Sequence, residues 1–109
     1  MTLNEYQAKA LETAIYPNIG KNIIYPALGL CSESGEVAGK VKKMLRDDGG
    51  ELSEVKRQEL IEELSDCMWY LAVIASELGV TLEEVAQRNV DKLLSRKERG
   101  VLGGSGDNR

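Results

Sequence analysis

The strongest hydrophobic pattern in the chain lies between Leu60 and Leu78. Apolar side chains recur there every three or four residues, at Leu60, Leu64, Cys67, Leu71, Ile74 and Leu78. At about 100° per residue these positions form one narrow stripe, which is typical of a helix that faces a core. From Cys67 onward the other faces are apolar too, as in a helix buried by more than one neighbour. The pattern predicts a central buried helix between a Ser53 cap and Gly79.

Two helices are predicted before this central one. Thr2-x-x-Glu5 has the spacing of a capping box and begins a first helix that ends before Pro17. Pro26 suits the first turn of a second helix, which runs to Asp47. Its apolar stripe is formed by Leu30, Val37, Val41 and Met44. The long segment from Tyr16 to Tyr25 between them is a candidate lid or pocket wall.

A fourth helix follows the central one. Thr81-x-x-Glu84 is a second capping box, and the helix should reach about Arg99. Its inward face is expected to hold Leu82, Ala86, Val90, Leu93 and Leu94. No strand alternation is present. The fold class expected is all-α, with a helical domain over residues 1–100 and a mobile Gly-rich tail over 101–109.

Composition agrees with one small globular domain, since 42% of the 109 residues are hydrophobic and 29% are charged. Four short helices cannot fully cover a central helix that is apolar on every side. We therefore expect a homo-oligomer, either a homodimer or a dimer of dimers, that completes the four-helix bundle.

Charge and residue types exclude several functions. A net charge of −4 argues against a nucleic-acid partner. The N-terminus is polar and no apolar run approaches the roughly 18 residues of a membrane span, so we expect a cytoplasmic protein with no membrane partner. The chain has no histidine, which excludes histidine-based catalysis and metal sites. Cys31 and Cys67 are expected to be reduced packing residues.

Two acidic pairs border the predicted core. Glu33-x-x-Glu36 and Glu63-x-x-Asp66 each point two carboxylates the same way on a helix. If the two helices pack antiparallel, four carboxylates face one another, and such hard oxygen ligands suit Mg²⁺, with Mn²⁺ as an alternative. Glu63 and Asp66 have no cation one turn away on their own helix. The competing interpretation is two solvated faces with a Glu36–Lys40 ion pair.

The acidic motif and its context resemble one known family. Glu33-x-x-Glu36, a 26-residue gap and Glu63-x-x-Asp66 look like the ExxE…ExxD motif of the MazG-like, all-α nucleotide pyrophosphohydrolases. The segments ALGLCSESGEVAGKVKK and ELIEELSDCMWYLAVIASELGVTLEEVAQRNVDKLLSRKERG are similar to that family, as are NEYQ and the final GSGDNR. The resemblance covers almost the whole chain.

The resemblance implies a Mg²⁺-dependent hydrolase acting on a nucleoside triphosphate. The bond cleaved would lie between the α and β phosphates, releasing a monophosphate and pyrophosphate, with nucleotide-pool housecleaning as the role. The family's metal-binding acids correspond to Glu33, Glu36, Glu63 and Asp66. Glu36 or Glu63 is the candidate general base. Polar positions on the last helix correspond to Asn89, Lys92 and Arg96, which would contact phosphate, with Lys40 and Lys43 as weaker candidates.

Other assignments stay open at this point. Trp69 is predicted to face away from the acids, into a helix or subunit interface, so base recognition is assigned to Tyr6, Gln7 and residues 18–25. A di-iron bundle is less suitable because such sites use Glu-x-x-His pairs. The second functional alternative is a non-catalytic helical dimerisation or binding module, which would need no magnesium.

Overall fold

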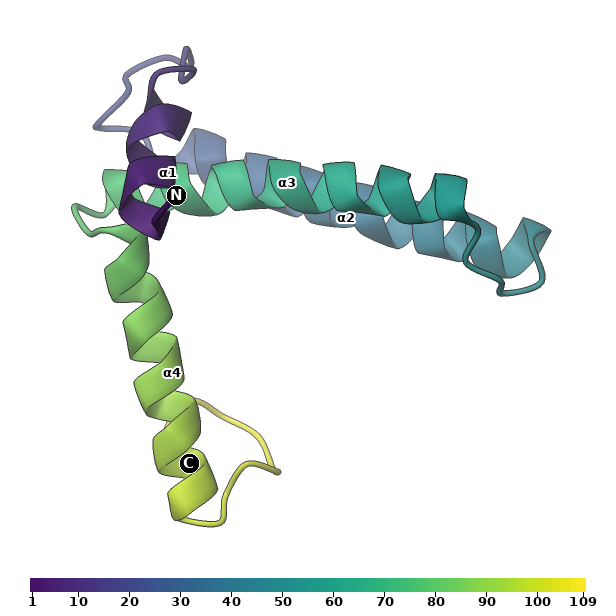
Figure 1. The fold of residues 1–109 in the computed structure, drawn as a ribbon. Coiled ribbons are helices and arrows are strands. Elements are labelled where there is room, and N and C mark those ends of the chain that lie inside the picture. Colours follow the sequence, from purple (N-terminus) through teal and green to yellow (C-terminus); the bar gives the residue numbers. More distant parts are fainter.

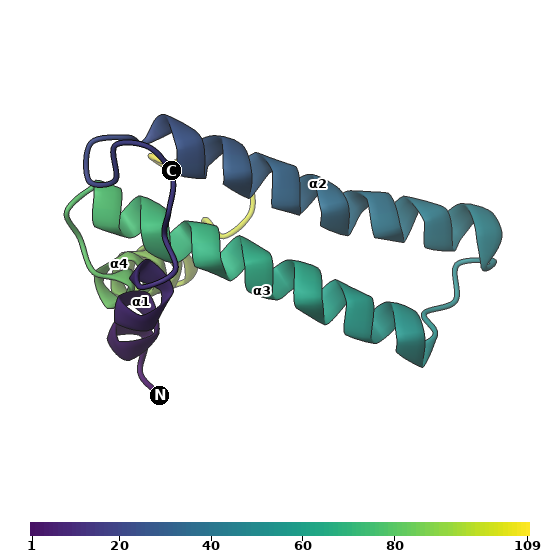
Figure 2. The same ribbon diagram turned by 90° about the horizontal axis from the view of Figure 1, so that it is seen from above.

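The computed structural model describes residues 1–109 and contains four helices and no strand. They are α1 (Leu3–Leu11), α2 (Ile24–Asp47), α3 (Glu54–Glu77) and α4 (Leu82–Glu98). α2 and α3 run side by side as a long hairpin, whereas α4 turns away from its end and α1 lies at the corner (Figures 1 and 2). The predicted all-α fold class is confirmed. None of these helices combines the length and apolar content required to cross a membrane.

The predicted N-terminal caps all form, but the predicted capping box is complete only at Thr2 and Glu5, whereas at Thr81 and Glu84 only the Thr81 hydrogen bond is present. Oγ1 of Thr2 accepts a hydrogen bond from the backbone N–H of Glu5, whose carboxylate accepts one from the N–H of Thr2, which completes the capping box. Ser53 and Thr81 cap α3 and α4 in the same way through one hydrogen bond each. After α3 the chain turns at Gly79, where φ is +72°, a conformation that favours glycine.

A small core lies at the corner where α1, α3 and α4 meet. Its centre is Ala10, Ala72 and Leu82, against which Leu3, Tyr6 and Trp69 pack. Gln7 is buried beside it and joins three segments: Nε2 donates to Ser76 Oγ (2.9 Å) and to the carbonyls of Ala72 and Val80, while Oε1 accepts from Leu82 N–H. Every polar atom of its amide is used internally, so the expected role of Gln7 in base recognition is wrong.

The apolar stripes are far more exposed than the sequence pattern suggested. On α3, Leu64, Leu71 and Leu78 are 58%, 45% and 64% exposed, and the buried positions are the small residues Ala72, Val73 and Ala75. The second half of the predicted inward face of α4 is also exposed, at Val90, Leu93 and Leu94. The inward orientation predicted for α4 is therefore wrong at these three residues within one chain, whereas incomplete cover of α3 by a single chain was expected.

The whole chain is correspondingly open. Its accessible surface is 7723 Å², whereas a compact monomer of 12.0 kDa exposes about 6,000 Å². The radius of gyration is 16.8 Å, compared with about 13 Å for a compact domain of this length. The L-shaped arrangement therefore leaves about 1,700 Å² of surface beyond that of an ordinary monomer, much of it apolar.

Candidate active site

Three of the four predicted metal-binding acids come together between α2 and α3. Glu33 projects from α2, and Glu63 and Asp66 project from α3, with one carboxylate oxygen of each within 4.8 Å of the others. Glu33 and Glu63 are half-buried, whereas Asp66 is exposed. The fourth acid, Glu36, is exposed and lies outside this group of three. The antiparallel hairpin thus juxtaposes the two motifs, which are 26 residues apart in the chain.

The acid cluster concentrates negative charge at Glu33. Burial raises the pKa of the Glu33 carboxyl above its ordinary value, and the charges of Asp66, Glu63 and Glu36 raise it further. The fourth acid is therefore close enough to act on Glu33 electrostatically, although it is not among the three closest carboxylates. Such uncompensated charge favours protonation or the binding of a cation.

One cation, Lys40 of α2, reaches the part of the cluster that lies on α3. Nζ of Lys40 on α2 lies 3.4 Å from a carboxylate oxygen of Glu63 and 3.8 Å from one of Glu59. The local ion pair considered between Glu36 and Lys40 does not form. Glu63 consequently has a protein cation that the sequence of its own helix does not supply.

Two of the clustered acids, Glu33 and Asp66, line a cavity of about 330 Å³ whose other walls are partly aromatic. Its lining consists of Thr13, Glu33, Asp66, Trp69 and Tyr70. The prediction that Trp69 faces away from the acids is wrong for Asp66, since both side chains line this cavity. The indole Nε1 donates to the carbonyl of Ala10 (3.2 Å) and to Oγ1 of Thr13 (2.8 Å), which fixes the ring against the end of α1.

Two further residues lie near the acids, although Tyr6 of α1 does not line their cavity. Burial raises the pKa of the Tyr6 phenol, and the charge of Asp66 raises it further. Thr13 follows α1 and lines the cavity, although no sequence pattern marked it as a site residue. Its position depends on how the end of α1 docks on α3.

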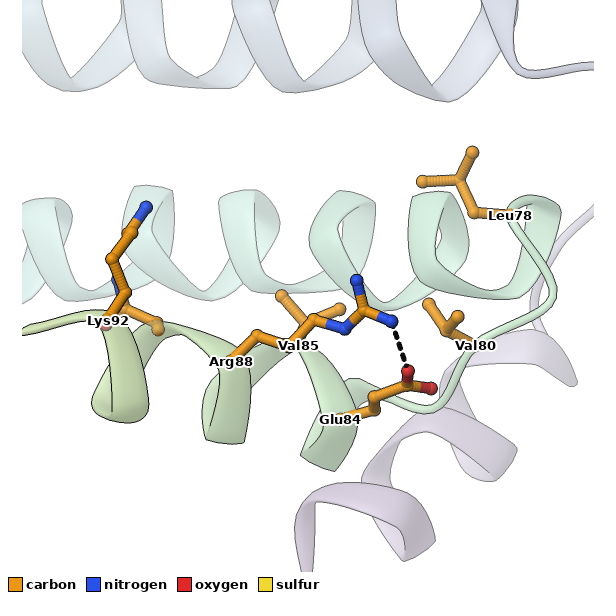
Figure 3. Close-up of a pocket in the computed structure, with 7 residues that line it drawn as sticks. Leu78, Val80, Glu84, Val85, Arg88 and Lys92 are labelled. Atoms are coloured by element: carbon orange, nitrogen blue, oxygen red, sulfur yellow. Dashed lines mark hydrogen bonds and ion pairs between the residues drawn. The ribbon is translucent and has the colours of Figure 1, made fainter. Parts of the chain in front are cut away.

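The predicted phosphate-binding residues lie on α4, apart from this cavity. Asn89 and Lys92 line a separate cavity of about 560 Å³, together with Arg88 and Glu84, which form an ion pair of 2.8 Å (Figure 3). No residue of α4 lines the cavity that contains Glu33 and Asp66. A single chain therefore does not bring the cationic face of α4 into the acidic cavity.

The third predicted phosphate contact, Arg96, is covered by the C-terminal tail. It is 5% exposed, and its guanidinium donates to the carbonyls of Gly106 (3.5 Å) and Asp107 (3.0 Å). The Asp107 carboxylate also lies 3.6 Å from Arg96 and 3.8 Å from Lys92. The tail thus folds back on α4 and provides a carboxylate beside the two cations.

The segment between α1 and α2 is fastened to the end of α3 through Glu77. The carboxylate of Glu77 accepts hydrogen bonds from the Tyr16 hydroxyl and from the backbone N–H groups of Gly20 (2.9 Å) and Asn22 (3.2 Å). Tyr16 is itself buried and stacks on Tyr25, with ring centroids 4.9 Å apart. This anchoring was not predicted, because Glu77 resembles any other charged residue at the end of a helix.

Comparison with known proteins places these features in context. The family model described as MazG nucleotide pyrophosphohydrolase domain matches residues 26–101, which is more than half of the chain. Gene 37 protein of Mycobacterium phage L5 is 49% identical over 114 residues, covering 100% of both chains. Uncharacterized protein YvdC of Bacillus subtilis (strain 168) is 38% identical over 74 residues, covering 63% of this chain and 70% of that protein. No solved structure matches the chain.

Proposed function

Because the chain belongs to the MazG nucleotide pyrophosphohydrolase family, we propose that it hydrolyses a nucleoside triphosphate between the α and β phosphates. The products are a nucleoside monophosphate and pyrophosphate, and the role is control of the nucleotide pool. The observation that carries this proposal is the convergence of Glu33, Glu63 and Asp66 from two helices, where Glu33 and Asp66 line one cavity. These are residues of the motif on which the family resemblance depends.

The donor set fits a hard divalent cation. All three clustered groups are carboxylates, burial and the neighbouring acidic charges raise the pKa of Glu33, and Lys40 pairs with Glu63 alone among the three. We assign Glu33, Glu63 and Asp66 as the residues that hold Mg²⁺, with Glu36 beside them and Mn²⁺ as a substitute. When bound, the cation would neutralise phosphate charge and make a water more acidic.

Proton transfer is assigned to Glu36 in preference to Glu63. Glu36 is exposed and stands outside the group of three, so its carboxylate is free to accept a proton from the attacking water. Glu63 is held by Lys40 and lies within the group, which suits a ligand better than a base.

A homodimer or dimer of dimers is part of the proposal. An apolar groove of about 450 Å³ between α3 and α4 is lined by Leu3, Leu64, Cys67, Met68, Leu71, Leu82, Val85, Ala86 and Asn89. Covering the excess surface of two chains would bury about 3,400 Å², within the range of obligate dimers. Because no α4 residue lines the acidic cavity of its own chain, we place the phosphate contacts of Asn89 and Lys92 at the acidic cavity of a second copy. Arg96 is buried under the C-terminal tail and would reach phosphate only after the tail moves.

Pyrophosphate release tests the function directly. Purified protein with Mg²⁺ should release pyrophosphate from at least one member of a panel of natural and damaged ribo- and deoxyribonucleoside triphosphates. Glu63→Gln keeps the shape of the side chain but removes a ligand charge, so turnover should fall by about 100-fold or more while the circular dichroism spectrum stays helical.

The matched control for this substitution is Glu62→Gln. Glu62 is exposed on the same helix and its carboxylate makes no ion pair or hydrogen bond, so turnover should stay close to that of the wild type. Near-normal turnover in Glu63→Gln would show that the acid cluster is structural. Absence of both turnover and thermal protection by Mg²⁺ with nucleotide would favour the non-catalytic helical module instead.

A further inference from the structure

Gly29 of α2 and Tyr70 of α3 form an unusually close helix contact. A methyl group added at Gly29 would overlap Cε1 and Cζ of the Tyr70 ring and lie 2.6 Å from Cδ1. Ordinary carbon–carbon contacts are about 3.5–4.0 Å. The ring therefore fills the space that a side chain at residue 29 would occupy. A glycine there is not required by a turn, since it lies inside a helix, and the contact with the ring supplies a reason for it.

This contact lies one helical turn from the acid cluster on both helices. Gly29 precedes Glu33 by four residues on α2, and Tyr70 follows Asp66 by four residues on α3. Residues four apart lie on the same helix face. α2 and α3 form the two arms of one hairpin (Figure 2). Because the two helices are antiparallel, the Gly29–Tyr70 contact and the approach of Glu33 to Asp66 are successive levels of one interface.

The Tyr70 ring also forms a wall of the acidic cavity. The indole of Trp69 contacts the Tyr70 ring edge to face, with a centroid distance of 4.9 Å. Trp69 is in turn hydrogen-bonded to the end of α1 and to Thr13 just after it. A side chain at residue 29 would have to push α2 away from α3 or displace the ring toward the cavity. Either movement would change the separation of the carboxylates or the space in front of them.

We propose that Tyr70, seated on Gly29, is a positioning residue that sets the spacing of α2 and α3 at the Glu33, Glu63 and Asp66 site. The distance between packed helices depends on the side chains at the point of contact. The Gly29–Tyr70 pair therefore fixes how closely the carboxylates approach, without itself binding the cation. This inference rests on the proposed function, in which those three acids hold the metal.

Mn²⁺ binding without nucleotide tests the inference independently of turnover. The free Mn²⁺ signal in electron paramagnetic resonance would be titrated well below the unfolding temperature of each variant. Gly29→Ala should weaken Mn²⁺ affinity by about 10- to 100-fold, the range for outer residues that orient metal ligands. The control Gly39→Ala lies on the same helix with no atom within 4 Å of the added methyl group, and its affinity should be unchanged.

Substitutions of Tyr70 separate the ring from the hydroxyl. Tyr70→Phe keeps the ring on Gly29 and should retain the wild-type Mn²⁺ affinity, whereas Tyr70→Ala should lower it. Adding Gly29→Ala to Tyr70→Ala should cause no further loss, because the added methyl group then has no ring to overlap. This comparison remains valid if Gly29→Ala alone does not fold.

The outcomes distinguish this inference from the proposed function. If wild-type protein binds Mn²⁺ and Gly29→Ala binds it as Gly39→Ala does, the positioning role is wrong and the metal site stands. Equal losses for Gly29→Ala in the wild-type and Tyr70→Ala backgrounds would also overturn it. If wild-type protein binds no Mn²⁺, the metal site of the proposed function fails and the positioning role fails with it.

Discussion

At the residue scale, Glu33 shows the cost of assembling like charges. Its raised pKa means that the folded chain binds a proton there more readily than the unfolded chain does. The ionised carboxylate is therefore unfavourable in the fold above its folded pKa, and this penalty disappears below the ordinary glutamate pKa of 4.5. A residue that destabilises the metal-free fold at neutral pH is typical of a functional site.

Glu33→Gln should therefore raise the melting temperature of the metal-free protein at pH 7, and the gain should shrink toward zero as the pH is lowered below about 4. Adding Mg²⁺ should reverse the order at pH 7, since wild type would gain protection that the variant lacks. Differential scanning fluorimetry with and without EDTA measures both effects. Glu62→Gln is the control. An equal rise in the melting temperature of that variant would show that the effect is not specific to Glu33.

At the element scale, the register of the α2–α3 hairpin organises the site. Gly29 meets Tyr70, Glu33 approaches Asp66, and Lys40 pairs with Glu59. Each of these pairs is placed symmetrically about the turn at Gly49 and Gly50. The same symmetry could have been applied to the sequence, and it would have suggested a cross-helix partner for Lys40.

The second element that shapes this end of the molecule is the segment between α1 and α2, bound to Glu77. Its hydrogen bonds lower the pKa of Glu77, chiefly through the Tyr16 hydroxyl, while burial and the same bond raise the pKa of Tyr16 to about 12. The contribution of ionised Glu77 to the stability of the fold is present above pH 4.5. It is lost as the pH falls through the lowered pKa that Glu77 has in the folded chain. The contribution of the protonated Tyr16 hydroxyl to the stability of the fold is present below pH 10 and is lost as the pH rises toward 12.

Tyr16→Phe should therefore lower the free energy of unfolding by about 1.5–3 kcal/mol at pH 7, the usual value of one hydrogen bond to a charged group. The loss should diminish in acid, once Glu77 is protonated in both states. Urea unfolding at pH 7 and at pH 3 measures it. In a double-mutant cycle with Glu77→Gln the two losses should not add, and simple additivity would contradict the bond.

At the scale of the whole molecule, the exposed apolar faces and the separation of the cations from the acids have one explanation. In the proposed assembly, a second copy would cover the first and supply α4 to its acidic cavity. The chain should accordingly sediment as a dimer or tetramer at micromolar concentration. A stable monomer under these conditions would contradict the proposed assembly.

Mixing two defective variants tests whether the site is shared. Lys92→Ala should lower kcat/KM by roughly ten- to a thousandfold, the range for losing one electrostatic contact to the transition state. Glu63→Gln should be inactive for a different reason. If each site combines the acids of one copy with Lys92 of another, subunit exchange between the two variants should restore about a quarter of wild-type activity, since half of the dimers are mixed and each has one intact site.

Failure of the mixture to regain activity, with exchange confirmed by differently tagged subunits, would place acids and Lys92 in the same chain. Unchanged kinetics of Lys92→Ala would remove it from the site altogether. The phosphate contact would then be assigned to Lys40 or Lys43.

The sequence by itself determined the elements and the chemistry of the acid motif. Caps at Thr2, Ser53 and Thr81, together with three- and four-residue spacing, locate four helices because these signals act within one or two turns of the chain. The spacing of Glu33, Glu36, Glu63 and Asp66 is likewise local to each helix, and the family match covers it.

Only the tertiary structure decided which surfaces those elements present to one another. Periodicity marks Leu64 and Leu71 as apolar, but it does not distinguish burial within a chain from burial between chains, and here both are exposed. The partners of Lys40 and Trp69 lie far away in the sequence, and those of Arg96 lie in the tail beyond α4, so they depend on how the helices and the tail dock. Docking is set by side-chain shapes at contacts that no local pattern encodes.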